Sequence, residues 1–189
     1  MPSLETEILI FILKEKNKDS YINFVETGTY LGETIFNVEP FFQNLYTIEI
    51  NQDDHNNVIS KYTGNKINFI LGDSSIELEF LSKNMNGNTV FFLDGHWSGG
   101  NTDKGKKDCP LYEEITHINN HFKYSGIIII DDHRLFGQGP NTSGEICNWE
   151  DINDNTILSI LDKRIEKIYY LQSKFNSKDR MIIEIKSLQ

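Results

Sequence analysis

The stretch FVETGTYLGETIF, from Phe24 to Phe36, begins as an apolar run typical of a buried strand and ends with the spacing of a helix. Glu26 closes the apolar run, and two glycines, Gly28 and Gly32, separate it from the helical half. A turn needs one glycine at most, so the second favours a backbone that comes close to a ligand. An ordinary strand-to-helix turn explains the stretch equally well when it is read alone. Because the spacing differs from G-x-G-x-x-G, it does not favour a nicotinamide cofactor.

The rest of the chain continues this alternation of strand and helix. Strand-like runs occur at Asn23–Val25, Leu45–Ile50, Ile67–Leu71, Val90–Leu93, Ile127–Ile130, Ile168–Leu171 and Met181–Ile185. Helical spacing occurs at Ser75–Leu81, Pro110–Phe122 and Thr156–Ile165. Only NSK separates the last two strands, which is too short for a crossover helix and predicts an antiparallel hairpin. The sequence therefore predicts an α/β fold, a doubly wound, mostly parallel sheet of seven strands with a C-terminal antiparallel hairpin strand and helices on both faces.

Length and charge limit the classes of partner. The 189 residues suit one domain over 1–189, and 18 basic against 28 acidic residues give a net charge of −10. This acidity disfavours nucleic acid and anionic membranes as partners. The N-terminal MPSLETEILIFILKEK predicts an amphipathic helix rather than a signal peptide. Cys109 and Cys147 alone make no disulfide framework, so we expect a cytoplasmic protein.

Polar residues follow the second and third predicted strands, where ligands of open α/β sheets bind. Glu49 ends the second strand, and its carboxylate can accept hydrogen bonds from both hydroxyls of a ribose or simply face solvent. Asp73 follows the third strand, where it can accept from an adenine amine, cap the next helix, or do both.

The order of these features resembles the Rossmann-like (class I) methyltransferases that use S-adenosylmethionine, and so does the run of seven strands ending in a hairpin. The resemblance implies that Glu26 holds the methionine part of the cofactor while Gly28 and Gly32 admit its body. The cofactor-binding residues that it implies are Glu26, Thr27, Gly28, Thr29, Tyr30, Gly32, Thr34, Glu49, Asp73, Ser74 and Asp94.

Carboxylates also follow the fourth and fifth predicted strands. Asp94 and His96 come after VFFL, and Asp131, Asp132 and His133 come after IIII. Grouped carboxylates repel one another unless a cation joins them, and oxygen ligands suit Mg²⁺, Mn²⁺ or Ca²⁺ better than Zn²⁺. In the alternative reading, Asp131 or Asp132 caps the next segment and His133 is a surface residue.

The combination LDG…IIIIDD is similar to the macrocin O-methyltransferase family, metal-dependent enzymes that methylate sugar hydroxyls. The resemblance implies a divalent cation, most simply Mg²⁺, on Asp94, Asp131 and Asp132. The family usually has a second acid two positions after the first, assigned as general base. In this sequence that position is His96, whose imidazole would act as the base, with Asp94 as the other catalytic residue. His96 as a metal ligand, or as a stacking residue beside Trp97, stays open. The acceptor implied is a glycan or another small-molecule hydroxyl, and a homo-oligomer is compatible with the sequence.

Two glycine-containing connections are candidate lids. The first, His96 to Glu114, carries Lys104, Lys106 and Lys107, which either meet an acidic acceptor or are solvated charges. The second, FGQGPNTSGEICNWED, carries Trp149, either a sugar platform or a core residue.

His117 and His121 are most simply surface residues of the helix predicted at Pro110–Phe122. His117 and His121 have the four-residue spacing of metal ligands, but the sequence shows no acidic partner for them. Two other functions also compete with methyl transfer: a non-catalytic module that binds a nucleotide or glycan, and a metal-dependent hydrolase that uses the same acids.

Overall fold

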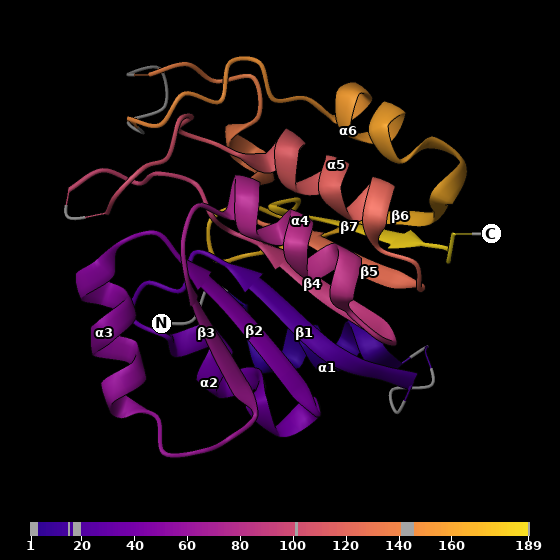
Figure 1. Ribbon diagram of the computed structural model, residues 1–189. Helices are drawn as coiled ribbons and strands as arrows, with labels where there is room; N and C mark the ends of the chain where they lie inside the picture. The colour runs from indigo at the N-terminus through magenta and orange to yellow at the C-terminus, as the bar shows by residue number, and fades with distance from the viewer. Residues whose placement is uncertain (1–3, 15, 17–19, 101, 141–145, 189) are drawn as a thin grey trace.

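The computed structural model describes residues 4–14, 16, 20–100, 102–140 and 146–188. These residues form a seven-stranded sheet in the order β3-β2-β1-β4-β5-β7-β6 (Figure 1). The strands are β1 (Tyr21–Thr27), β2 (Asn44–Glu49), β3 (Ile67–Leu71), β4 (Asn88–Leu93), β5 (Gly126–Ile130), β6 (Ile165–Leu171) and β7 (Arg180–Ile185). The first five strands pair in parallel, and β7 lies antiparallel between β5 and β6. The predicted doubly wound sheet with its C-terminal hairpin is confirmed.

Helices cover both faces of the sheet. They are α1 (Thr6–Lys14), α2 (Glu33–Val38), α3 (Gln52–Lys61), α4 (Ser74–Asn84), α5 (Leu111–His121) and α6 (Asp154–Leu161). The last three lie side by side on one face, and α1 and α2 lie on the other (Figure 1). Strand residues alternate between two apolar clusters, so Phe91 packs with the α4–α6 layer and Phe92 with the α1–α2 layer. This two-sided burial explains why the central strands are continuously apolar.

The helix predicted at Thr156–Ile165 ends earlier than expected. It stops at Leu161, and Ile165 is instead the first residue of β6. The buried Arg164 side chain donates hydrogen bonds to the carbonyls of Ile118 (2.9 Å) and Lys186 (3.0 Å). A 3-10 turn over Asp162–Arg164 follows α6, and the tertiary hydrogen bonds of the Arg164 side chain hold this turn at the entry to β6, which periodicity does not reveal.

The remaining predicted helices agree with the structure within a few residues. The N-terminal helix is α1, although residues 1–3 and 15 of the quoted stretch lie outside the described residues. Pro110 stands directly before α5, where its missing N–H costs nothing. Among the described residues, no helix is long and apolar enough to cross a membrane.

Candidate cofactor cleft and active site

A cavity of about 1200 Å³ opens at the carboxyl ends of the parallel strands. The loop between β4 and α5 forms a further wall of it. Of the residues predicted for the site, those that line the cavity are Glu26, Gly28, Thr29, Tyr30, Thr34, Glu49, Asp73, Ser74, Asp94, His96, Asp131 and Asp132. Thr27 and Gly32 do not line it. The fold thus brings to one cleft side chains that are more than 100 positions apart in the sequence.

Gly28 marks the place where the end of β1 comes closest to the end of β4. Its φ is +81°, and a Cβ atom there would lie 2.5 Å from the Asp94 carbonyl oxygen. No side chain fits at that distance from a backbone atom, and the left-handed conformation also favours glycine. The turn therefore needs glycine for its backbone path, and this explains why the apolar run ends there.

Gly32 and Thr27, the other two predicted residues near this turn, are buried behind the cleft wall. Gly32 also has a left-handed backbone, with φ +80°, and a Cβ there would lie 2.8 Å from a Val58 methyl group of α3. Thr27 is fully buried, and its hydroxyl oxygen lies 3.3 Å from the Asp94 amide nitrogen. Both residues hold the backbone that forms the cleft wall, and neither lines the cavity itself.

Glu26 is a buried acid at the floor of the cleft, with 1% of its surface exposed. Burial raises the pKa of Glu26 to about 8, against the opposing effect of a hydrogen bond that the Thr47 hydroxyl donates (2.7 Å). The negative charge of Glu49 raises this pKa further. Glu26 therefore carries a proton at neutral pH in the protein without ligand, and a cationic ligand would favour its ionised form.

We expect Glu26→Gln to flatten the dependence of stability on pH. Between the ordinary glutamate pKa of 4.5 and the raised pKa of about 8, folded Glu26 keeps a proton that the unfolded chain has lost. The folded state then binds more protons, so the free energy of unfolding falls as pH rises through this window. Melting curves at several pH values test this, and parallel pH profiles of Tm for the parent protein and the variant would contradict it.

Glu49 is held in place by backbone donors. The Tyr30 amide donates to Glu49 Oε2 (2.7 Å), and the Asn51 amide donates to Oε1 (2.8 Å). Tyr30 itself adopts a left-handed φ of 47°. Each carboxylate oxygen keeps a further lone pair, so the oriented Glu49 is still able to accept two hydroxyl groups.

Asp73 serves as the N-cap of α4. Its side chain accepts hydrogen bonds from the Ser75 amide (2.9 Å) and the Ser75 hydroxyl (2.6 Å), so the capping role is present. The β4–α5 loop folds over this part of the cleft, because a Cβ atom at Gly105 would lie 2.0 Å from Asp73 Oδ2. Asp103 of the same loop accepts a hydrogen bond from the Asn51 side chain (2.8 Å). Described residues of the first candidate lid therefore lie against the ends of β2 and β3.

The lysines of this loop are largely engaged. Lys104 pairs with Asp108 (2.9 Å) and lies over the Trp97 ring, and Lys107 pairs with Glu113. The solvated-charge reading fits these two lysines better than a grip on an acidic acceptor.

Glu114 on α5 is a buried acid next to the cleft that the sequence analysis missed. It is 1% exposed, and burial raises its pKa to about 7, opposed by hydrogen bonds with Ser74 and Thr27. It lies on the same helical stripe as the buried Leu111 and Ile118. An acid in the apolar stripe of an amphipathic helix was the available signal.

His96 lies between two carboxylates at the ends of β4 and β5. Its Nδ1 is 3.7 Å from Asp94 Oδ1, and its Nε2 is 3.4 Å from Asp132 Oδ2. The Ser98 hydroxyl lies 3.1 Å from the same Nε2. The ring packs against Trp149 with centroids 4.9 Å apart, not against Trp97. Because Trp149 is only 3% exposed, it is a core residue that supports His96 and is not an open sugar platform.

The three predicted metal carboxylates do not form one group. Among the described residues, ligand atoms of Asp94, His96 and Asp132 lie within 4.8 Å of one another, and a second group joins Asp131, Asp132 and Asp179. Asp131 Oδ1 lies 3.3 Å from Arg180 Nε of β7, and this ion pair draws the carboxylate away from Asp94. Burial and the Asp132 charge raise the pKa of Asp131 to about 7, and Arg180 opposes this rise.

The segment after β5 is held by polar contacts. Arg134 pairs with Asp132 and with the fully buried Asp179 (2.8 Å), an acid that the sequence analysis did not single out. His133 is not a free surface residue, because its Nε2 lies 2.8 Å from Asp154 Oδ1. Residues 141–145 of the second candidate lid lie outside the described residues.

The architecture is that of the Rossmann-like fold found in solved structures of S-adenosylmethionine-dependent methyltransferases. The N-methyltransferase NodS from Bradyrhizobium japonicum WM9 is similar over 97% of this chain and 96% of its own, with 11% identity and a TM-score of 0.59. A NodS complex with S-adenosyl-L-homocysteine matches with 13% identity, 97% and 85% coverage and a TM-score of 0.59. An S-adenosylmethionine-dependent methyltransferase from Clostridium acetobutylicum ATCC 824 matches with 16% identity, 96% and 89% coverage and a TM-score of 0.60.

At these identities the likeness shows the fold alone. No protein-family model matches the chain, and no curated protein matches it by sequence.

Proposed function

We propose that the protein is an S-adenosylmethionine-dependent methyltransferase that acts on a hydroxyl of a sugar or another small molecule. The observation that carries the proposal is the convergence of three features at adjacent strand ends of the cleft. These are the Gly28 turn that a Cβ atom would close, the buried Glu26 and the backbone-held Glu49. They suit a ligand with a cationic end and a ribose, because Glu26 gains charge beside a cation and Glu49 accepts hydroxyl groups.

When bound, the cofactor supplies an activated methyl group and loses its positive charge as the methyl group leaves. The chain has to align an acceptor oxygen and help it lose a proton. His96 is the base in this proposal, since its imidazole lies at the cleft wall between Asp94 and Asp132. A carboxylate on either side favours the imidazolium that forms when His96 takes the proton.

A divalent cation is a second part of the proposal, supported by the close grouping of Asp94, His96 and Asp132. Two carboxylates and one imidazole form a donor set that Mn²⁺ accepts at least as readily as Mg²⁺. A cation on these residues would lower the pKa of an acceptor hydroxyl. Asp131 is not part of this ligand set, because it is paired with Arg180. The sugar acceptor rests on the resemblance of LDG…IIIIDD to the macrocin O-methyltransferase family.

Calorimetric titration with S-adenosylhomocysteine tests the proposed cofactor. We expect a dissociation constant in the micromolar range for the parent protein, and weaker binding in Glu49→Gln, which retains the size of the side chain. The titration is repeated with Mn²⁺, with Mg²⁺ and with a chelator to detect heat from a cation. Absence of binding under all of these conditions would contradict the proposal and favour another ligand for the glycine turn.

A further inference from the structure

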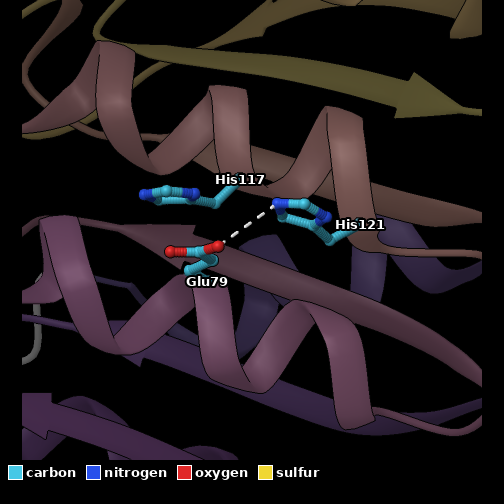
Figure 2. A group of neighbouring side chains, drawn as sticks. All are labelled: Glu79, His117 and His121. Carbon is cyan, nitrogen blue, oxygen red and sulfur yellow. Dashed lines mark ion pairs between the residues drawn. The ribbon is translucent and has the colours of Figure 1, made fainter.

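The structure supplies the acidic partner that the sequence does not show for the histidine pair on α5. Glu79 of α4 faces His117 and His121, and Figure 2 shows the three side chains pointing toward one another between the two helices. One nitrogen of each ring and one Glu79 oxygen lie within 4.8 Å of one another. The same face of the molecule thus carries two imidazoles and a carboxylate, which we call the α4–α5 cluster.

The register of the two helices produces this meeting. Ser75 and Glu79 are one turn apart on α4, as His117 and His121 are on α5. His117 therefore faces Ser75, and His121 faces Glu79. His117 Nε2 lies 2.9 Å from the Ser75 carbonyl oxygen, which can only accept a hydrogen bond. The proton is therefore on Nε2, and the lone pair of His117 is on Nδ1. Histidines that bind metals commonly donate the other ring N–H to a backbone carbonyl in this way.

The distances within the cluster are close to those of a metal site. His121 Nε2 lies 3.6 Å from Glu79 Oε1. Two ligands of a tetrahedral Zn²⁺ are roughly 3.4 Å apart when each bond is about 2.1 Å long. The two imidazole rings are nearly parallel, at 18°, with centroids 6.2 Å apart. The three side chains are partly exposed and their ligand atoms already lie within 4.8 Å of one another, so a binding ion requires only side-chain rotations to draw them closer.

We propose that Glu79, His117 and His121 form a binding site for Zn²⁺ or a similar transition-metal ion. Two imidazoles select such ions over Mg²⁺ and Ca²⁺, which prefer oxygen ligands. Three protein ligands leave a fourth position for water or for a ligand from outside. The ion would link α4 to α5, which cover the same face of the sheet. None of the three ligands lines the cleft cavity. The site therefore does not depend on methyl transfer.

Lys83 is the natural competitor of the metal ion. Its ammonium group pairs with Glu79 Oε1, and its side chain is 49% exposed, so it is free to move into solvent when a metal ion arrives. Removing this cation leaves the carboxylate available and takes away a positive charge. Lys83→Gln should therefore bind Zn²⁺ more tightly than the parent protein.

Calorimetric titration with Zn²⁺ tests the site. Every protein in the Zn²⁺ experiments also carries His96→Gln, which removes the imidazole of the cleft group. In these experiments the parent is the protein with this substitution alone. We expect binding of one ion and at least a tenfold loss of affinity, as an order of magnitude, in His121→Gln. His55→Gln removes a histidine of α3 and should leave the affinity unchanged. Equal affinity in the parent and His121→Gln, or a loss in His55→Gln alone, would overturn the proposal.

Thermal unfolding gives a second measurement that does not rely on heats of binding. An ion that binds only the folded chain raises Tm as its concentration exceeds the dissociation constant. We expect saturating Zn²⁺ to raise the Tm of the parent and to leave that of His117→Gln/His121→Gln unchanged. Both proteins should melt alike with chelator, since these side chains are partly exposed. An equal Zn²⁺ shift in both proteins would contradict the assignment.

Discussion

Gly28→Ala should weaken binding of S-adenosylhomocysteine by about 100-fold or more. Two costs add at this position. The left-handed φ of +81° costs an alanine roughly 1–2 kcal/mol. The new methyl group would also stand 2.5 Å from the Asp94 carbonyl oxygen. Relief requires the ends of β1 and β4 to separate, which moves the walls that hold Glu26 and Asp94. A 100-fold loss corresponds to about 2.7 kcal/mol.

Gly137→Ala is the matched control for backbone strain. Gly137 has a nearly equal φ of +75°, but a Cβ atom there meets no atom within 4 Å, and the residue does not line the cleft. Gly137→Ala should therefore have the same conformational cost without a steric clash. The affinity of this variant for S-adenosylhomocysteine should stay within about threefold of that of the parent protein. Calorimetry on both variants, with circular dichroism to verify folding, makes the comparison. Similar losses in the two variants would show that close approach at Gly28 is not the cause.

The success of the sequence analysis on the fold has a specific physical origin. Strands buried on both faces must be apolar throughout, so IIII at β5 and VFFL at β4 are visible without a structure. The NSK connection is too short for a crossover, which fixes the antiparallel hairpin. Asp94 stands out because it directly follows the buried β4, and Glu49 and Asp73 stand out as acids at the end of β2 and two residues after β3.

What the sequence analysis missed depends on contacts between distant segments. The separation of Asp131 from Asp94 follows from the attraction of Arg180 on β7, 49 positions later. The partner of His117 and His121 is on α4, and only the register of two helices identifies Glu79 among several acids. Glu114 is different, because its place in the apolar stripe of α5 was readable from periodicity.

His96→Gln should lower kcat by about 10²- to 10⁴-fold, the usual contribution of general acid–base catalysis. Glutamine fills similar space beside Trp149 but has no basic nitrogen. Since this substitution leaves Glu26, Gly28 and Glu49 untouched, affinity for S-adenosylhomocysteine should change less than about threefold. The assay follows transfer of a labelled methyl group to hydroxyl acceptors. His121→Gln, the same substitution on α5 outside the cleft, should retain the parent rate.

A chelator separates the two roles that the geometry allows His96. If His96 acts as the base without a cation, chelation leaves the parent rate unchanged and His96→Gln removes the pH dependence that an imidazole imposes on kcat. If His96 is a ligand beside Asp94 and Asp132, chelation lowers the parent rate as far as the substitution does, and Mn²⁺ restores it. Both roles need the same short distances from His96 to its two carboxylates. Parent activity in His96→Gln, with or without chelator, would therefore refute both, and methyl transfer would then need a base from elsewhere in the cleft.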